Sequence, residues 1–270
     1  MSSAFPSISI ITPSLNQGRF IEQTITSVLE QDYPYLEYIV IDGGSTDNTL
    51  EVLKKYSNKI LWISEPDSGQ SNAINKGLRM TSGDVVAYLN SDDIYEPGAL
   101  QVVGRFFASH TKAAWLTGRC RLINQYGIEI RRGITLYKNF MLSTNNYQVL
   151  QVLDFISQPA TFWRKKVFDE IGDFDDELDY AMDYDYSLRV GMKHKLWVVK
   201  KYLASFRIHP SSKSGAYTIA QFEEDFQIAK RYSSSRLLLY LHAVHNSLII
   251  RIYGFLKQKH LRRSITSTEI

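Results

Sequence analysis

The sequence predicts an α/β protein with a mostly parallel β-sheet flanked by helices. Three observations predict this class. Strand-like and helix-like segments alternate through the first hundred residues with a repeat of about 25 residues, which is typical of βαβ units. Each predicted strand ends in a short polar segment, where open α/β sheets bind their ligands. The composition, 270 residues with 44% hydrophobic and 22% charged, is that of an ordinary globular protein.

The first half of the chain supplies the sheet. β-branched and apolar runs predict strands at 7–12, 38–41, 59–64 and 85–89. Apolar residues at helical spacing predict helices at 18–31 and 70–80, with a further helix between them that Ser45 or Asp47 caps. Pro97 stands where the first residue of another helix is expected. Because such crossovers are almost always right-handed, the carboxyl ends of the strands are expected along one edge of the sheet.

The pattern changes after Ala113. Residues 113–135 are expected to form a hairpin with its turn at 125–127, and residues 136–153 are weakly patterned. The pattern then alternates again, with strands expected at 160–163 and 195–206 and helices from Lys165 and near 181–192. Two helices are expected after about residue 214. We therefore expect one α/β domain at 1–213 and a helical C-terminal extension at 214–270.

Charge and cysteine content argue against several classes of function and cellular location. The net charge of +3, from 31 basic and 28 acidic residues, is too small to favour nucleic-acid binding. The single cysteine, Cys120, allows no intrachain disulfide and fits a reducing compartment. The N-terminus has no signal-peptide pattern, and polar residues interrupt the apolar stretch at 237–256. We expect a cytoplasmic protein whose basic, amphipathic tail either packs on the body or contacts the inner face of a membrane.

The polar strand ends form the candidate binding site. Neither early strand is followed by a G-x-G-x-x-G or G-x-x-x-x-G-K-[ST] loop, so dinucleotide and P-loop chemistry lose their main support. Asp92 and Asp93 instead follow the strand at 85–89, and adjacent carboxylates repel each other unless a cation intervenes. Such oxygen ligands suit Mg²⁺ or Mn²⁺, which usually also bind a diphosphate. The alternative is a simple turn before the helix at Pro97.

Three further positions have both a functional and a structural interpretation. Asp42 could accept hydrogen bonds from a base or ribose, or it could only order a glycine-rich turn. Asp183 and Asp185 are two residues apart on a helix and therefore lie on different faces. Asp185 precedes Arg189 by four residues, the favoured order for an ion pair, which leaves Asp183 free to act as a general base. The structural alternative for Asp183 is a first-turn charge that complements the helix dipole. His209 could bind a metal or a phosphate, although a lone histidine more often has a structural role.

Together these segments resemble the family-two glycosyltransferases, which are inverting enzymes with the GT-A fold. Residues 9–49 resemble the nucleotide-binding first half of that family. Residues 65–93 resemble the segment that leads into its DxD-type metal motif, and residues 157–189 resemble its acceptor side, which ends in the helix that carries the base. The resemblance covers residues 7–210 in order.

The resemblance implies a role for each candidate residue. Those implied to bind the nucleotide are Pro13, Asn16, Asp42, Asp67, Gly69, Asn72 and Asp92. Those implied to hold a divalent metal, Mn²⁺ or Mg²⁺, are Asp92, Asp93 and His209, and Arg207 is expected to approach the diphosphate or the metal. Asp183 is implied to be the catalytic base. Two positions depart from the family: Asn90 stands where the metal motif often begins with Asp, and Met182 stands where Glu often precedes the base.

The expected function is transfer of a sugar from a nucleotide-sugar to a hydroxyl of a saccharide or lipid-linked saccharide. The expected donor is a UDP-sugar, and the expected setting is bacterial-type cell-surface polysaccharide synthesis. One alternative is a nucleotidyltransferase. Such an enzyme normally has a basic, glycine-rich loop near the N-terminus, and residues 12–16 do not form one. Another is a non-catalytic sugar-binding protein on the same fold. The sequence leaves the donor sugar, the acceptor and the oligomeric state open.

Overall fold

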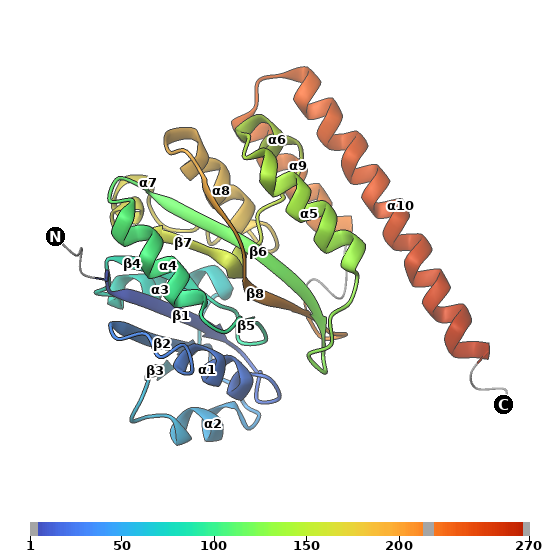
Figure 1. Cartoon of the computed structure of the whole chain (residues 1–270). Coiled ribbons are helices and arrows are strands. Elements are labelled where there is room, and N and C mark those ends of the chain that lie inside the picture. The colour runs from blue at the N-terminus through green and yellow to red at the C-terminus, as the bar shows by residue number, and fades with distance from the viewer. Residues whose placement is uncertain (1–4, 213–218, 267–270) are drawn as a thin grey trace.

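The computed structural model describes residues 5–212 and 219–266, with the backbone alone for residues 253–266. One sheet of eight strands runs through the molecule in the order β3-β2-β1-β4-β7-β6-β8-β5 (Figure 1). The strands are β1 (Ile8–Ser14), β2 (Leu36–Asp42), β3 (Leu61–Ser64), β4 (Val85–Tyr88), β5 (Ile94–Tyr95), β6 (Trp115–Asn124), β7 (Thr161–Arg164) and β8 (Trp197–Ile208). The helices before the C-terminal extension are α1 (Ile21–Leu29), α2 (Thr49–Lys55), α3 (Gln70–Met80), α4 (Ala99–Ser109), α5 (Arg132–Thr144), α6 (Tyr147–Val152), α7 (Lys166–Ile171) and α8 (Met182–Lys193).

The first four strands are parallel, as the alternating pattern predicts. β1 pairs with β2 and with β4, and β2 pairs with β3. This register puts Ser14 beside Asp42 and Asp42 beside Ser64, so the polar strand ends do meet at one edge. β6 and β8 are also parallel to each other, whereas β7 and the short β5 are antiparallel to the strands they pair with. The α/β class expected from the sequence is confirmed.

Two hydrophobic cores lie on the two faces of the sheet. β1 contributes to both, because successive side chains of a strand point to opposite faces. Ile8 and Ile10 belong to the core that also contains residues of α1, α2 and α4, and Ile11 belongs to the core that contains residues of α3, α6, α7 and α8. α3 approaches β1 closely, since a Cβ on Gly77 would lie 2.5 Å from Ile11 Cγ2.

Two sequence expectations need correction. The turn at 125–127 is present, with Gly127 N donating to Asn124 O at 3.0 Å, but the expected second hairpin arm to residue 135 is wrong. A single bridge, Ile123 to Glu129, takes its place, and α5 begins at Arg132. Pro97 does not open α4, because Gly98 adopts a left-handed conformation (φ 76°) and the helix begins after it.

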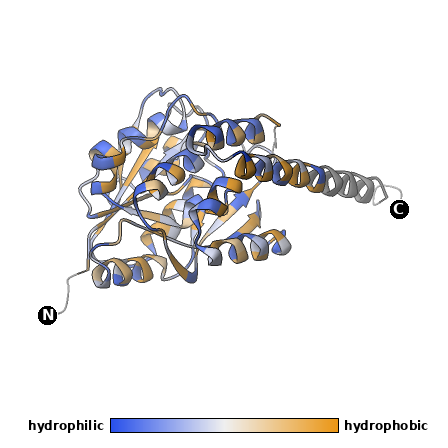
Figure 2. Cartoon of the chain, turned by 90° about the horizontal axis from the view of Figure 1, so that it is seen from above, coloured by the Kyte–Doolittle hydropathy of each residue, from blue (hydrophilic) through white to orange (hydrophobic). Residues whose placement is uncertain are grey.

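The two expected C-terminal helices are present as α9 (Ile219–Tyr232) and α10 (Arg236–Thr266). α9 is partly built into the domain, because Ile228 and Ala229 are fully buried in the core that contains α8. α10 runs outside α6 and α9 and projects beyond the body (Figure 1). The first turns of α10 carry both hydrophilic and hydrophobic residues (Figure 2). Among the residues described, none of the helices has the length and apolar character that a bilayer crossing needs. The expected domain boundary at 213/214 lies outside the described residues.

Candidate active site

The ends of β1 and β2 carry a closely hydrogen-bonded pair of loops. Asp42 ends β2 and has no exposed surface. Its Oδ2 accepts hydrogen bonds from Ser45 N at 2.9 Å and from Ser64 Oγ at 2.7 Å. Asn16 lies exposed on the neighbouring loop, and its Oδ1 accepts from Thr46 N at 2.8 Å. Asp42 therefore orders the loop, and its direct contact with a base or ribose stays a prediction.

The predicted donor-side residues after β3 lie beside this loop. A Cβ on Gly43 would stand 2.7 Å from Asp67 Oδ2, so the loops after β2 and β3 are in contact. Asp67 Oδ1 accepts a hydrogen bond from Gly69 N at 2.9 Å. Gly69 has a φ of 125° and leads into α3, where Asn72 is half-buried. Pro13 is buried within β1. Asn16, Asp42, Asp67 and Gly69 are thus brought to one sheet edge.

Asp92 and Asp93 point in different directions. Asp92 Oδ2 lies 3.0 Å from His209 Nε2, and the Asp92 side chain keeps 17% of its surface exposed. Asp93 is fully buried, and its Oδ1 accepts from Arg207 N at 2.7 Å while its Oδ2 accepts from Asn90 Nδ2 at 3.3 Å. Burial, and after it the charge of Asp92, raises the pKa of Asp93 well above its ordinary value. Asp92 is therefore the member of the pair with an accessible carboxylate.

The buried Arg207 side chain stabilises the turn that carries Asp92 and Asp93. The residue is 1% exposed. Its Nε donates to Asp92 O at 2.6 Å, its Nη1 to Asn124 O at 3.2 Å and its Nη2 to Gln23 Oε1 at 2.9 Å. The guanidinium is thus occupied by protein oxygens, one of them the backbone oxygen of Asp92, and a direct approach of Arg207 to the diphosphate or the metal stays a prediction.

α8 separates the two carboxylates as the helical spacing predicts. Asp185 is buried, its Oδ2 accepts from Arg189 Nε at 2.8 Å, and its Oδ1 accepts from Tyr232 OH at 2.6 Å. The structural role expected for Asp185 is confirmed. Asp183 is half-buried, and its Oδ1 accepts a hydrogen bond from Tyr184 N at 3.0 Å. Burial raises the pKa of Asp183, and Lys138 opposes that rise.

Tyr88, at the carboxyl end of β4, lies near both Asp183 of α8 and Asp93 at the strand end. Burial raises its pKa well above the ordinary value, and Asp183, Asp93 and Asp154 add to that rise. A charge acts on a neighbour in this way only at short range. Asp183 on α8, Asp93 at the strand end and Asp154 after α6 therefore all lie close enough to Tyr88 to act on it by their charge.

Sequence reasoning missed two carboxylates near Asp183. Burial raises the pKa of Asp154 to about 7, with Lys138 opposing the rise and Asp183 adding to it. Asp225, on α9, has its pKa raised well above the ordinary value by burial and then by Asp154 and Asp183. A sequence signal existed for Asp154, which stands alone inside the apolar run at 152–156. Asp225 gave no signal, because only the tertiary fold brings α9 to the site.

Comparison with known proteins identifies the family. Residues 9–172 match the profile of glycosyl transferase family 2. The chain belongs to this family. An uncharacterized glycosyltransferase of Rickettsia felis is 28% identical over 229 residues, which are 83% of this chain and 37% of that protein. TuaG of Bacillus subtilis, named for teichuronic acid biosynthesis, is 36% identical over 123 residues, 44% of this chain and 48% of TuaG. The chain thus spans less than half the length of these two relatives.

Solved structures show the same fold. Residues 1–349 of S. aureus TarS, in complex with UDP-GlcNAc, match with a TM-score of 0.65 and 20% identity, over 82% of this chain and 65% of that one. The mannosyltransferase PcManGT from Pyrobaculum calidifontis, in complex with GDP-Man and Mn²⁺, matches with a TM-score of 0.69 and 18% identity, over 90% of this chain and 70% of that one. The GT-A fold expected from the resemblance is confirmed.

The side chains of Asp92 and His209 offer ligand atoms that suit a divalent metal. Asp92 and His209 offer one carboxylate oxygen and one imidazole nitrogen 3.0 Å apart. No group of three or more His, Cys, Asp or Glu that could hold a metal occurs within residues 5–212 and 219–252. Mg²⁺ and similar ions are often held by only one or two protein ligands, with substrate phosphates and water completing the shell. The pair at Asp92 fits such an ion.

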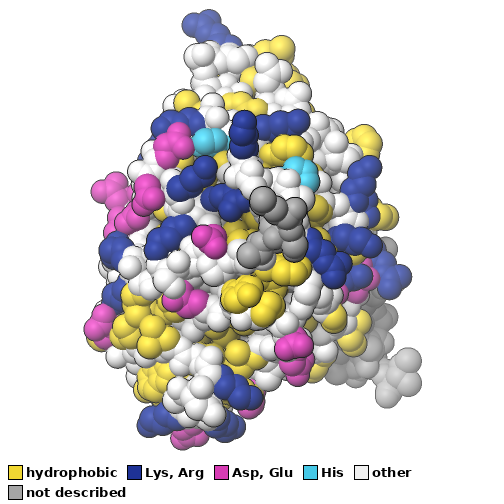
Figure 3. All heavy atoms as spheres, turned by 60° about the vertical axis from the view of Figure 1, so that its left-hand side comes forward, with side chains coloured by type: hydrophobic (Ala, Val, Ile, Leu, Met, Phe, Trp, Pro, Cys, Tyr) yellow, Lys and Arg dark blue, Asp and Glu magenta, His cyan; other side chains and the backbone are white. Residues whose placement is uncertain are grey.

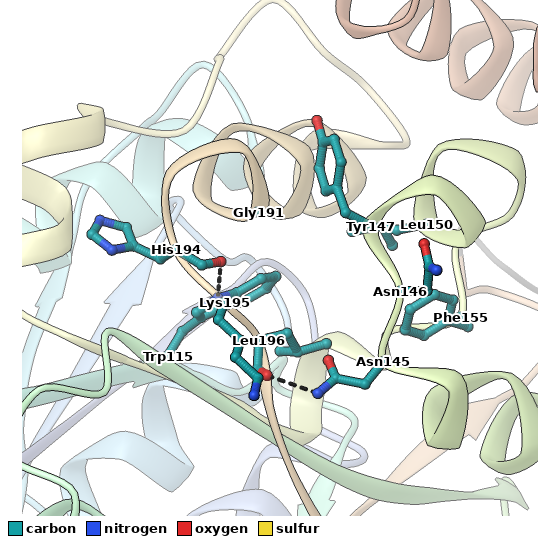
Figure 4. Close-up of a pocket in the computed structure, with 10 residues that line it drawn as sticks. All are labelled: Trp115, Asn145, Asn146, Tyr147, Leu150, Phe155, Gly191, His194, Lys195 and Leu196. Carbon is teal, nitrogen blue, oxygen red and sulfur yellow. Dashed lines mark hydrogen bonds between the residues drawn. The ribbon is translucent and has the colours of Figure 1, made fainter.

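A separate pocket of about 160 Å³ lies at the amino end of β6 (Figure 4). Trp115, the first residue of β6, forms one wall, and α6 and α8 supply others. Trp115 Nε1 donates to His194 O at 3.2 Å, and Asn145 Nδ2 donates to Leu196 O at 3.0 Å. None of the predicted site residues of the family-2 chain lines this pocket.

Proposed function

We propose that this chain is an inverting, metal-dependent glycosyltransferase that moves a sugar from a nucleotide-sugar to an acceptor hydroxyl. The proposed donor is a UDP-sugar. The observation that carries the proposal is that Asp183, on α8, and Asp93, which follows Asp92 in the chain, both act by their charge on Tyr88. The Asp92–His209 pair suits a cation and the diphosphate of a nucleotide-sugar, and Asp183 offers a carboxylate of raised pKa on the α8 side. Family membership and the donors bound to TarS and PcManGT support this assignment.

In this mechanism Asp183 removes the proton of the acceptor hydroxyl. The acceptor oxygen then attacks the anomeric carbon from the face opposite the diphosphate, the bond from that carbon to the diphosphate oxygen breaks, and the configuration inverts. A raised pKa makes Asp183 a stronger base than an ordinary carboxylate. Asp92 and His209 would hold the metal, which when bound neutralises charge on the departing nucleoside diphosphate. Asn16, Asp67 and Gly69 line the edge where the nucleoside would bind.

The test begins with a thermal-shift panel of UDP-GlcNAc, UDP-glucose, UDP-galactose and GDP-mannose, each with Mn²⁺. A ligand that binds only the folded state raises the melting temperature, so the donor should stand out. Mass spectrometry should then detect release of the nucleoside diphosphate, and NMR of the product should show inverted anomeric configuration. Release of pyrophosphate would indicate a nucleotidyltransferase instead. Binding of a nucleotide-sugar with no turnover on any acceptor would favour a non-catalytic sugar-binding protein.

Asp183→Asn tests the base directly. General-base catalysis typically contributes about 10²–10⁴-fold in rate, so this variant should lose that much turnover and keep donor binding. Wild-type turnover in Asp183→Asn would remove Asp183 from the mechanism.

We also propose that the acceptor is a saccharide or lipid-linked saccharide at the inner membrane face, in cell-surface polysaccharide synthesis. The name of TuaG supports this setting. On the face shown in Figure 3, Lys and Arg side chains are mixed with Asp and Glu. Residues 236–266 of α10 differ, since they contain six Lys or Arg and no Asp or Glu. A segment of that charge is attracted to anionic lipid.

The exposed face of α10 has the apolar side chains that membrane contact requires. Leu237, Leu241, Val244 and Leu248 are exposed and spaced for one helix face. His242, on the opposite face, is buried against Gln151. Replacing Leu241, Val244 and Leu248 by Ser should reduce flotation with phosphatidylglycerol vesicles, while Leu136→Ser with Phe140→Ser on α5 serves as the control. Equal flotation of both variants would count against α10 as the contact.

A further inference from the structure

The segment that leads into α8 is held by one side chain from the C-terminal extension. α8 begins at Met182, and its N-cap residue, Ala181, makes no side-chain cap. Glu224 Oε1 accepts hydrogen bonds from Tyr180 N at 2.8 Å and from Ala181 N at 2.7 Å, and Oε2 accepts from Asp179 N at 3.1 Å. One carboxylate thus binds three successive backbone N–H groups directly before the helix.

This contact is strong for two physical reasons. Hydrogen bonds between backbone N–H groups and an ionised carboxylate are shorter and stronger than bonds between neutral groups. The carboxylate also lies at the N-terminus of α8, where the helix dipole favours negative charge. Removing it would leave three N–H groups without this acceptor, at the point where the chain turns into the helix that carries Asp183.

α9 fixes α8 at a second place as well. Tyr232, the last residue of α9, donates from its hydroxyl to Asp185 Oδ1 at 2.6 Å. Glu224 and Tyr232 therefore hold α8 on both sides of Asp183, from the same helix. The side chain next to Glu224, Asp225, reaches the carboxylates of Asp154 and Asp183 by its charge. α9 is therefore positioned to influence the α8 side of the site.

We propose that Glu224 is a positioning residue of the transfer reaction: by holding the N–H groups of residues 179–181 it sets the place of Asp183 in the site. The inference rests on the proposed function, in which Asp183 is the base. A base must lie within hydrogen-bond reach of the proton it removes, and a displacement of about 1 Å can cost about 10²-fold in rate. Glu224 acts through Asp183 and touches neither donor nor acceptor.

The experiment compares Glu224→Ala and Glu224→Gln with Glu223→Ala, a control at the exposed neighbouring position on the same helix. The assay is release of nucleoside diphosphate from the panel nucleotide-sugar that turns over fastest, with Mn²⁺ and with water as acceptor. We expect kcat to fall about 10²-fold in Glu224→Ala and about tenfold in Glu224→Gln, whose Oε1 can still accept from Tyr180 N and Ala181 N. The donor KM should change less than about twofold, because the donor side is built from other elements.

A merely structural role would not move the pH profile. Glu224 raises the pKa of Asp183, so both Glu224 variants should shift the acidic limb of kcat to lower pH, while Lys138, Asp154, Asp225 and Tyr88 stay in place around Asp183. Hydrogen exchange of the amides at 179–181 should also become faster, a readout that needs no substrate.

The outcomes separate this inference from the proposed function. An inactive Asp183→Asn together with wild-type kcat in Glu224→Ala overturns the Glu224 inference alone. The same holds if Glu223→Ala loses as much kcat as Glu224→Ala, or if the donor KM rises in step with the loss of kcat. Full turnover in Asp183→Asn overturns the proposed base itself. Should Glu224→Ala not fold, Glu224→Gln decides by the same criteria.

Discussion

Replacing Asp154 by Asn should make the protein more stable above neutral pH. Asp154 is half-buried beside Asp183 and Asp225, and burial raises its pKa from 3.8 to about 7. One pKa unit corresponds to about 1.36 kcal/mol, so ionising Asp154 costs the folded protein about 4 kcal/mol more than it costs the unfolded chain. Asn carries no charge, and its Oδ1 can still accept the hydrogen bond that Ile156 N donates to Asp154 at 3.1 Å.

The sign of the pH dependence follows from which state keeps the proton. Below about pH 4 Asp154 is protonated in both states and has no effect. Between about pH 4 and pH 7 the folded protein keeps the proton and the unfolded chain has lost it. The free energy of unfolding therefore falls by about 1.36 kcal/mol for each pH unit. Above pH 7 both states are ionised, and the loss is complete.

The assay is urea unfolding of wild type and Asp154→Asn at pH 5 and pH 8. Because the slope applies over most of this interval, the difference between the two proteins should grow by about 2 to 3 kcal/mol towards pH 8, where the Asp154→Asn variant should be the more stable. Asp176→Asn, at an exposed position, is the control and should follow wild type. If the difference between wild type and Asp154→Asn is the same at both pH values, the burial argument for Asp154 is refuted.

Three further predictions concern the metal pair, α8 and the sheet. His209→Ala should weaken Mn²⁺-dependent donor binding in a thermal-shift titration, whereas His194→Ala, at a half-buried position beside Glu170, should not; equal loss in both would argue against the metal pair. Asp185→Asn should lower the free energy of unfolding by about 2–3 kcal/mol in urea, because it weakens the buried contacts to Arg189 and Tyr232. Gly77→Ala should lower it by about 1–3 kcal/mol, because the new Cβ would stand 2.5 Å from Ile11 Cγ2; unchanged stability would mean that α3 shifts freely.

The parallel half of the fold was predictable because its signals are local. β1, β2 and β4 are short apolar runs that end in polar residues, and α1 and α3 have apolar residues at helical spacing. The segment at 136–153 gave no pattern for a physical reason. α5 buries only Thr135 and Leu142, and its large apolar side chains Leu136 and Phe140 are exposed, so no apolar stripe marks the helix.

The site was predictable where neighbours in sequence decide it. The choice between Asp183 and Asp185 followed from helical spacing, and the Asp185–Arg189 contact agrees with it. The choice between Asp92 and Asp93 did not follow, because both sit at the same strand end. It depends on β8, in which Arg207, 114 residues after Asp93, donates from its backbone N to Asp93 Oδ1. Such a long-range contact leaves no trace in the spacing of residues 90–93.

The expected division into a domain and a helical extension also depends on contacts that spacing cannot show. α10 fits the description of an extension, since it lies outside the body and exposes one apolar face. α9 does not, because Ile228 and Ala229 complete the core beneath α8, and Glu224 and Tyr232 hold α8 itself. A deletion that begins at residue 214 would therefore remove part of the hydrophobic core along with the tail. Loss of activity in such a deletion would not distinguish a membrane role of α10 from the collapse of α8, whereas substitutions on the exposed face of α10 leave α9 in place and do distinguish them.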